Sequence, residues 1–305
     1  MMDKVALERQ LVAGFPHDCI LRDEPMAKHT TFEVGGPADF VVLVRDADDL
    51  RTAIGAAKAA GAPWHVLGCG SNVLVADAGL PGVVAIIGEA MSRIEVDGRM
   101  VKAQAGATNE QVAEAALAAG LSGYEFASGI PGSIGGAAIM NAGAYDGEFR
   151  DVAVSVECLT PDGELVEVSA DEAGWSYRHS MMMDRGYIVL SATLRLAPAD
   201  PAEIRAKMDD LAERRSSKQP LELPSAGSTF KRPTGYFAGK LIQDAGMRGH
   251  RVGGAMVSEK HCGFVVNAGG ATAADVLQVI DDVRSAVRAD AGVELEPEVR
   301  LWGFA

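Results

Sequence analysis

The stretch that decides the fold is Trp64-His-Val-Leu67, which runs directly into Gly68-Cys69-Gly70-Ser71-Asn72. The first four residues have the composition of a short strand, and the glycines that follow predict a tight loop at its end. Such a loop exposes successive backbone N–H groups, which suit an anionic pyrophosphate. Taken alone, however, it is more often only a tight turn, and it lacks the third glycine of the dinucleotide fingerprint at the required offset.

A second glycine-rich stretch follows at Gly129-Ile130-Pro131-Gly132-Ser133-Ile134-Gly135-Gly136-Ala137. Two such loops in one chain favour a long dinucleotide that lies across both of them over a mononucleotide held by one. The sequence therefore favours a flavin or a nicotinamide dinucleotide. No P-loop is present, because Gly239-Lys240 is followed by leucine instead of Ser or Thr.

The segments around these loops alternate between strand and helix patterns. Asp46 is expected to begin a helix that ends at Gly61. Thr108 and Gln111 form a capping-box pattern for a helix through Leu117. Strands are expected at 40–44, 64–67, 73–75, 83–87 and 187–196, hairpins at 94–103 and 152–168, and further helices at 201–218 and 276–289. This irregular order predicts α+β lobes instead of a regular βαβ repeat.

The composition is that of an ordinary globular protein, with 305 residues, 48% hydrophobic side chains and a formal charge of −14. The negative balance argues against a general nucleic-acid binder. No apolar run approaches the roughly 20 residues that span a bilayer, and neither membrane insertion nor a signal peptide is expected, so the cytoplasm is the expected location. The cysteines are widely spaced, which predicts reduced thiols and no metal site: Cys19, Cys69, Cys158 and Cys262.

Further motifs accompany the two loops in a fixed order along the chain. They are Thr30-Thr-Phe-Glu-Val-Gly-Gly-Pro-Ala38, Asn141-Ala-Gly-Ala-Tyr145, Tyr177-Arg178-His179-Ser180, Gly227-Ser-Thr-Phe-Lys-Arg-Pro233 and Glu296-Pro-Glu-Val299. From about Thr30 to the C-terminus, this set resembles the UDP-N-acetylenolpyruvoylglucosamine reductase family. The resemblance implies an FAD-dependent enzyme that uses NADPH to reduce the enolpyruvyl ether of a UDP-sugar to UDP-N-acetylmuramate, a peptidoglycan precursor.

The resemblance also implies an architecture. An FAD-binding domain of the vanillyl-alcohol-oxidase (PCMH) type is expected over residues 1–205, as two α+β lobes at about 1–80 and 81–205. A smaller α+β substrate-binding domain is expected over residues 206–305, with its last residues returning to the FAD site. The short stretch between Phe230 and Val257 predicts the compact form of the family, which has no additional tyrosine-bearing loop. A monomer or a weak homo-oligomer is expected.

The same resemblance assigns both glycine loops to FAD. The expected cofactor-binding residues are Gly68, Cys69, Gly70, Ser71, Asn72, Gly129, Ile130, Pro131, Gly132, Ser133, Gly135, Gly136 and Ala137. Related oxidases often attach their flavin through a His or Cys of the first loop. This loop has no His, and Cys69 is more simply a small packed residue, so non-covalent FAD is expected.

Three residues are candidates for the chemistry. Reduction of an enol ether adds a hydride to one carbon and a proton to its neighbour, and no side chain can supply the hydride. Arg178 carries a permanent forked charge that suits a carboxylate or a developing enolate. The resemblance makes Ser228 the proton donor, and Glu298 the group that polarises the site or relays protons in it. Because a serine hydroxyl is a weak acid, a nearby cation is expected, either Lys231 or Arg232.

A local excess of positive charge follows Ser228. Residues 231–251, called here the basic segment, carry five Lys or Arg side chains against one acid. They would attract the diphosphate of the substrate and the phosphates of NADPH, although a solvated basic face shows the same pattern. The expected substrate contacts are Tyr177, Lys231, Lys240, Gln243, Ser258 and Asn267.

Two other classes of function stay open on the sequence alone. An FAD oxidase of the same domain family would act on a small alcohol or hydroxy acid, and would need a His or Tyr base. It would leave Ser228, Glu298 and the basic segment unexplained. A non-catalytic module would hold a nucleotide in the glycine loops without redox chemistry, and would be colourless where a flavoprotein is yellow.

Overall fold

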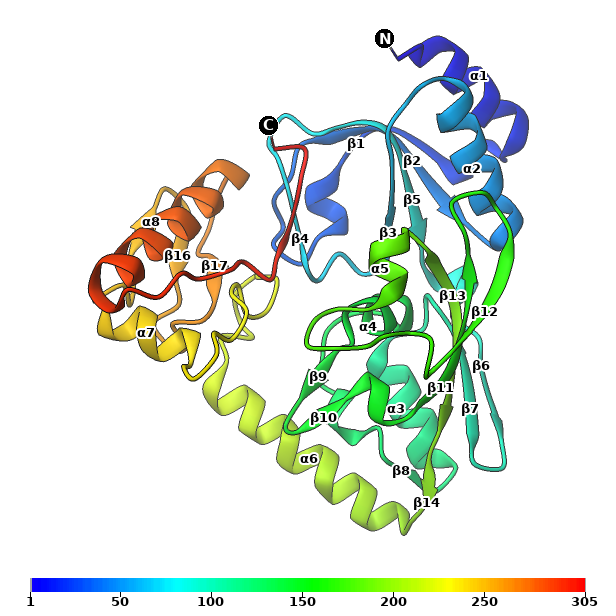
Figure 1. The fold of residues 1–305 in the computed structure, drawn as a ribbon. Helices are drawn as coiled ribbons and strands as arrows, with labels where there is room; N and C mark the ends of the chain where they lie inside the picture. The colour runs from blue at the N-terminus through cyan, green and yellow to red at the C-terminus, as the bar shows by residue number, and fades with distance from the viewer. Residues whose placement is uncertain (1, 305) are drawn as a thin grey trace. The chain divides into compact units, whose positions relative to one another are not determined.

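An antiparallel five-stranded sheet in the order β12-β11-β13-β7-β6 is the largest sheet of the computed structural model, which describes residues 2–304 (Figure 1). Its strands are β6 (Ile94–Asp97), β7 (Met100–Gln104), β11 (Ala153–Leu159), β12 (Leu165–Ser169) and β13 (Ile188–Arg195). The two hairpins predicted from the sequence form its two edges, and both are confirmed.

A second sheet has four strands in the order β1-β2-β5-β3, and β3 runs parallel to β5. These strands are β1 (Ile20–Pro25), β2 (Pro37–Val44), β3 (Trp64–Leu67) and β5 (Leu80–Ile87). A three-stranded sheet joins β15 (Arg251–Val252), β16 (Ala255–Val257) and β17 (Val265–Asn267). Shorter pairs join β4 (Val73–Val75) to β18 (Arg300–Trp302), β8 (Leu121–Ser122) to β14 (Ala197–Pro198), and β9 (Gly143–Ala144) to β10 (Gly147–Glu148).

The structure describes eight α-helices, and an Asp, Thr or Ser side chain caps the first turn of five of them. The eight helices are α1 (Lys4–Gly14), α2 (Ala47–Ala59), α3 (Asn109–Ala118), α4 (Ile134–Met140), α5 (Met181–Arg185), α6 (Pro201–Lys218), α7 (Ala238–Asp244) and α8 (Ala273–Ala291). The predicted caps are confirmed: the Asp46 side chain accepts a hydrogen bond from the Asp49 backbone, and Thr108 with Gln111 forms the capping box of α3.

The chain divides into two compact units, each made of several segments. The first unit comprises the residues up to Ile20, Val42–Cys69 and Val83–Arg215, and the second comprises Leu21–Val41, Gly70–Gly82 and the chain from Ser216 onward. The first glycine loop is therefore shared, with Gly68 and Cys69 in the first unit and its last three residues in the second. The domains predicted at 1–205 and 206–305 concern cofactor and substrate binding, and they stay a prediction.

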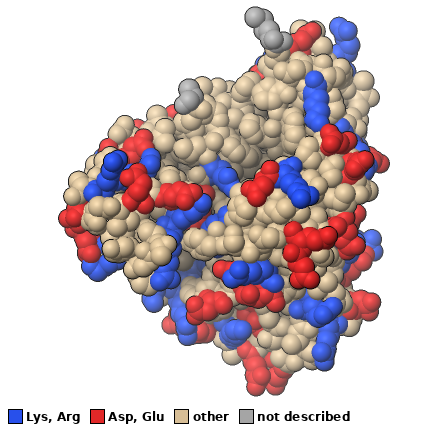
Figure 2. Space-filling model, viewed as in Figure 1, with Lys and Arg blue, Asp and Glu red and all other residues tan. Residues whose placement is uncertain are grey.

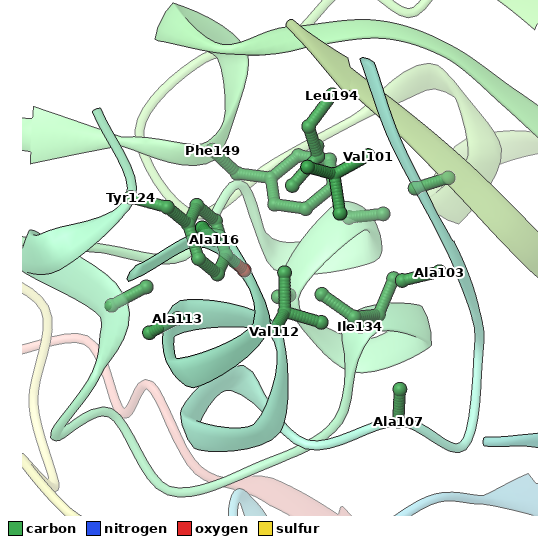
Figure 3. Packing of buried hydrophobic residues seen from close by; sticks show 14 of the residues in the cluster. Val101, Ala103, Ala107, Val112, Ala113, Ala116, Tyr124, Ile134, Phe149 and Leu194 are labelled. Atoms are coloured by element: carbon green, nitrogen blue, oxygen red, sulfur yellow. The ribbon is translucent and has the colours of Figure 1, made fainter. Parts of the chain in front are cut away.

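The core of the first unit lies where α3 and α4 pack against the five-stranded sheet (Figure 3). Small side chains such as Ala113 and Ala116 of α3 and Ala103 of β7 lie in this core among larger ones such as Val112 and Ile134. Tyr124 is fully buried among them, and its hydroxyl donates a hydrogen bond to Asn109 Oδ1 at 2.8 Å. Burial raises the pKa of Tyr124, so this phenol stays protonated.

The core of the second unit is built on α8, which packs on the three-stranded sheet (Figure 1). Its buried side chains recur at helical spacing: Val276, Val279, Ile280, Val283 and Val287. The carboxylate of Asp77 accepts hydrogen bonds from the backbone N–H groups of Ala273 and Ala274 at 2.8 and 2.9 Å. Thus the segment that follows the first glycine loop is fixed to the start of α8.

The structure corrects one expectation and adds three helices that were not predicted from the sequence, α1, α5 and α7. The second glycine stretch is not a loop throughout, because α4 begins at Ile134 within it. Tertiary packing outweighs the low helix propensity of the glycines: Ile134 is fully buried and its N–H donates to the Ala107 carbonyl at 2.8 Å. The helix α1, which the sequence analysis did not identify, packs on α2 through buried Leu7 and Leu11.

On the surface drawn in Figure 2, Lys and Arg side chains are interspersed with Asp and Glu. Between residues 2 and 304 no helix is long and apolar enough to cross a membrane. No three His, Cys, Asp or Glu side chains in this range gather closely enough to hold a metal ion. Its four cysteines are free thiols, of which Cys158 and Cys262 are buried.

Candidate active site

The two glycine loops meet in the first unit at Gly68 and Ser133. A Cβ atom added to Gly68 would lie 2.5 Å from the Ser133 hydroxyl oxygen, so only glycine fits there without a shift. The neighbouring Cys69 is exposed, but the atoms packed around its sulfur raise the pKa of the thiol, and a hydrogen bond with Ser133 opposes this only in part. A protonated thiol is a poor nucleophile, which supports the expectation of non-covalent FAD.

Two adjacent glycines at the start of α4 face different surroundings. A Cβ at Gly135 would lie 3.0 Å from the Cβ of Ala105, whereas a Cβ at Gly136 would meet nothing within 4 Å. The helix is therefore packed tightly on the sheet on one side and open on the other. The open side leaves room for a flat dinucleotide, so these residues fit the FAD that the sequence predicts.

In the second unit, Ser228 and Glu298 lie on adjacent backbone segments. The Glu298 N–H donates to the Thr229 carbonyl at 2.8 Å, and the Lys231 N–H donates to the Glu296 carbonyl at 2.9 Å. Ser228 is exposed and Glu298 half-buried, while Thr229 between these contacts is fully buried. The structure thus brings together two of the three predicted catalytic residues, which we call the Ser228–Glu298 pair.

The last residue of the first glycine loop belongs to the same arrangement. The Asn72 side-chain amide donates to the Glu298 carbonyl at 3.2 Å, and the Asn72 carbonyl accepts from the Arg300 N–H at 3.0 Å. The parallel pairing of β4 with β18 continues this contact. Asn72, which is expected to bind FAD, therefore holds the backbone of Glu298, which is expected to relay protons.

Arg178 lies in the first unit and has an unusual backbone. Its φ is +55°, in the left-handed region that a non-glycine residue seldom adopts, and such strain is concentrated at functional sites. Its Nη2 donates to the Gly143 carbonyl at 3.1 Å, and its guanidinium lies 5.0 Å from the centre of the Tyr177 ring. Tyr177, a predicted substrate contact, is exposed.

The predicted contacts of the basic segment have partners within the protein. Lys231 forms an ion pair with Glu296 at 2.5 Å, and Lys240 forms one with Asp244 on the next turn of α7. The Gln243 side-chain oxygen accepts a hydrogen bond from Arg248 at 2.6 Å. Opposite charges therefore offset part of the positive potential that the sequence predicts here.

Ser258 and Asn267 are nearly fully buried and shape loops. The Ser258 hydroxyl accepts hydrogen bonds from the Lys260 and His261 N–H groups at 3.2 and 3.3 Å. The Asn267 amide donates to the Phe32 carbonyl at 3.1 Å and its oxygen accepts from Gly269 and Ala271. Both side chains thus hold backbone in place, and their predicted contact with substrate stays a prediction.

No role was predicted from the sequence for Thr229 or Tyr145. Thr229 follows the proposed proton donor within the motif Gly227–Pro233, and this position was the available signal. Tyr145 lies at the tip of the β9–β10 hairpin, where both Tyr145 and Asp146 have positive φ. The guanidinium of Arg215 lies 5.9 Å from the centre of its ring, and burial lowers the pKa of Arg215. The motif ending in Tyr145 was the available signal.

The α+β fold and the two glycine loops define a protein that binds a flavin dinucleotide. A family model described as "FAD binding domain" matches residues 38–169, and "UDP-N-acetylenolpyruvoylglucosamine reductase, C-terminal domain" matches residues 219–302. The chain belongs to the UDP-N-acetylenolpyruvoylglucosamine reductase family. The enzyme of that name from Agathobacter rectalis is 54% identical over 97% of this chain and 98% of its own length.

Other relatives agree. The UDP-N-acetylenolpyruvoylglucosamine reductase of Alkaliphilus oremlandii is 47% identical over 99% of both chains. The crystal structure of UDP-N-acetylenolpyruvylglucosamine reductase (MurB) from Thermus caldophilus superposes with a TM-score of 0.79, at 36% identity, over 93% of this chain and 98% of that one. The family and the FAD-binding α+β fold expected from the sequence are confirmed.

Proposed function

We propose that the protein reduces the enolpyruvyl group of UDP-N-acetylglucosamine enolpyruvate to give UDP-N-acetylmuramate, a peptidoglycan precursor, in the cytoplasm. NADPH is the hydride donor, and a proton from the protein completes the addition, so NADPH and one proton are consumed for each product formed. The observation that carries this proposal is the Ser228–Glu298 pair, joined by a backbone hydrogen bond of 2.8 Å between Glu298 and Thr229. It supplies a proton donor and a carboxylate beside Asn72 of the cofactor loop.

Bound FAD would supply a carrier for the hydride between NADPH and the enol ether. The residues that would hold it are those of the two glycine loops, with Gly68 and Ser133 in contact and open space beside Gly136. Cys69 keeps its proton, so no activated sulfur is available for attachment. These properties favour a cofactor held by backbone groups and shape.

Ser228 delivers the proton to the carbon next to the one that receives the hydride. Gly227, with a φ of +72°, allows the turn that exposes this hydroxyl, and buried Thr229 fixes the backbone on its other side. Glu298 returns a proton to Ser228 after each turnover. A positioned donor of this kind contributes about 10² to 10⁴ in rate.

Arg178 stabilises the negative charge that develops on the substrate carboxylate and its enolate form. A guanidinium stays charged at all relevant pH values and offers two parallel N–H groups to a carboxylate. The bond to the Gly143 carbonyl and the strained backbone fix its direction before substrate arrives. Preorganised charge of this kind stabilises a transition state without further rearrangement.

The test follows the colour of the flavin. The purified protein should be yellow, with FAD released by heat. NADPH should bleach it under anaerobic conditions, and the UDP-enolpyruvyl sugar should restore the colour with formation of UDP-N-acetylmuramate. A colourless protein without affinity for FAD would overturn the proposal, as would a bleached protein that the sugar leaves unchanged.

A further inference from the structure

The turn from Pro233 to Phe237 presents two aromatic side chains to solvent. Tyr236 is 48% and Phe237 62% exposed, and Phe237 is the most exposed aromatic side chain within residues 2–304. Two adjacent aromatic side chains exposed in one turn form an apolar patch, and such a patch is a candidate for contact with a ligand.

The exposed ring is held in place by its neighbours. The guanidinium carbon of Arg232 lies 4.0 Å from the centre of the Phe237 ring, which is close cation–π stacking. The Arg232 Nε donates to the Tyr236 carbonyl at 3.2 Å, and the Tyr236 N–H donates to the Pro233 carbonyl at 3.1 Å. Gly235, with a φ of +79°, permits the turn. The ring is therefore a fixed surface with a cation on one face.

The chemistry around this ring matches a nucleotide. A fixed aromatic face stacks on a nucleobase, which also has a flat π surface. Arg232 adds positive charge for a phosphate, and Lys231 and Lys240 of the basic segment lie nearby in the chain. The combination of a stacking ring with a guanidinium is what a nucleoside diphosphate requires.

We propose that Phe237, backed by Arg232, is the stacking platform for the uracil of the UDP-sugar. This inference rests on the proposed function. Phe237 follows Ser228 by nine positions in the same unit, and a chain that turns at Gly235 spans less than its extended limit of roughly 3.3 Å per residue. The adenine of NADPH is the other base that could stack here, and the test separates the two.

The test compares three variants. Phe237→Leu keeps an apolar side chain but loses the π face, Phe237→Trp enlarges that face, and Tyr236→Leu is the control in the same turn. The probes are UDP and NADP⁺, each titrated into the FAD-loaded protein by calorimetry, together with steady-state kinetics.

Phe237→Leu should weaken UDP binding and raise the KM for the UDP-sugar by roughly 5- to 100-fold, the range that loss of base stacking produces. The kcat and the KM for NADPH should change less than about twofold, because the stacking contact stabilises the bound substrate and the transition state equally. Phe237→Trp should bind UDP at least as tightly as the parent protein. Tyr236→Leu should bind UDP like the parent protein.

Unchanged UDP affinity in Phe237→Leu would overturn the proposal that Phe237 stacks on uracil. A loss confined to NADP⁺ would assign the ring to adenine and overturn the assignment to uracil. An equal loss in Tyr236→Leu would attribute the effect to the shape of the turn, and the proposal would fail. Since UDP binding requires no turnover, each of these outcomes is distinct from a failure of the parent protein to reduce the enolpyruvyl sugar.

Discussion

The residues proposed for cofactor binding in the first unit and those proposed for proton transfer in the second are held in place by different physical means. In the first unit the glycine loops fit by close packing, where the absence of a Cβ at Gly68 and Gly135 lets backbone and helix approach. In the second unit the Ser228–Glu298 pair is held by backbone hydrogen bonds between chain segments about 70 residues apart in sequence. The first arrangement would select the shape of the proposed cofactor, and the second would fix the direction of the groups proposed to carry protons. Substitutions in the first unit should therefore change mainly stability and FAD binding, and substitutions in the second unit should change mainly the rate of proton transfer.

The largest expected effect is in the second unit. Ser228→Ala removes the proposed proton donor, so reoxidation of the reduced flavin by the UDP-enolpyruvyl sugar should slow by about 10²- to 10⁴-fold. Reduction of the flavin by NADPH needs no proton donor to the sugar and should be nearly unchanged. Stopped-flow absorbance of the flavin resolves the two halves. Ser228→Cys should recover part of the loss, and equal slowing of both halves would make the serine a structural residue.

Arg178 tests whether the first unit also contributes directed charge. Arg178→Lys keeps the charge but loses the planar fork, so kcat should fall by about tenfold or more while FAD stays bound. Turnover and the flavin content of the purified variant are measured together. Unchanged turnover would remove Arg178 from the catalytic residues, and loss of flavin would place it in the cofactor site.

Thr229 tests how the Ser228–Glu298 pair is positioned. Its hydroxyl accepts a hydrogen bond from the Val265 N–H at 2.9 Å, and its own N–H donates to the Gly263 carbonyl at 2.8 Å. Thr229→Val leaves the buried Val265 N–H without this acceptor, which costs about 1–3 kcal/mol. We expect a lower melting temperature and about tenfold slower reoxidation by the sugar, with flavin reduction by NADPH unchanged.

Thr229→Ser is the matched control, because it keeps the hydroxyl and removes only a methyl group. It should restore most of the reoxidation rate. If both variants lose stability equally and reoxidise at the parental rate, Thr229 supports the fold alone and does not position Ser228.

Local sequence patterns predicted those helices and hairpins whose formation is determined by residues close together in the sequence. The caps at Asp46 and Thr108, the hairpins and the apolar stripe of α8 were all recognisable because their determinants lie within one or two turns of chain. The helix α4 was not recognisable, since Gly135 and Gly136 disfavour helix and contacts with residues distant in the sequence, such as Ala105 and Ala107, stabilise it.

The site shows the same limit. Family motifs pointed to Ser228 and Glu298, but not to the backbone bond through Thr229 that joins their segments, because that bond depends on long-range folding. The count of charged residues predicted a positive segment, but it could not predict the acidic partners that offset this charge, such as Glu296, which pairs with Lys231. The exposure of Phe237 and the stacking of Arg232 on it likewise require coordinates.

A pair of neighbouring glycines tests the packing of the first unit. Gly135→Ala places a Cβ 3.0 Å from the Cβ of Ala105, and the strain should cost about 1–2 kcal/mol of stability. Gly136→Ala places its Cβ in open space and should stabilise α4 by up to about 1 kcal/mol, since alanine favours helix. The melting temperatures of the flavin-free proteins measure both effects.

The same pair reports on the cofactor. If FAD fills the space beside Gly136, Gly136→Ala should weaken FAD binding although it stabilises the free protein. Fluorescence titration of flavin-free protein with FAD measures this. Parental FAD affinity in Gly136→Ala would place the dinucleotide elsewhere.

The smallest expected effect concerns Lys240, because the carboxylate of Asp244 already offsets part of its positive charge. Lys240 and Asp244 are both largely exposed and pair on one face of α7, so the net field that a phosphate meets is weaker than the charge count suggests. Lys240→Ala should raise the KM for the UDP-sugar by about two- to fivefold with little change in kcat, and added salt should reduce the difference between variant and parent. Asp244→Asn is the matched opposite, since it leaves Lys240 without that carboxylate and should lower the KM by a similar factor at low salt. If both variants keep the parental KM at every ionic strength, the Lys240–Asp244 pair is part of a solvated surface, and attraction of the substrate belongs to other cations of the basic segment.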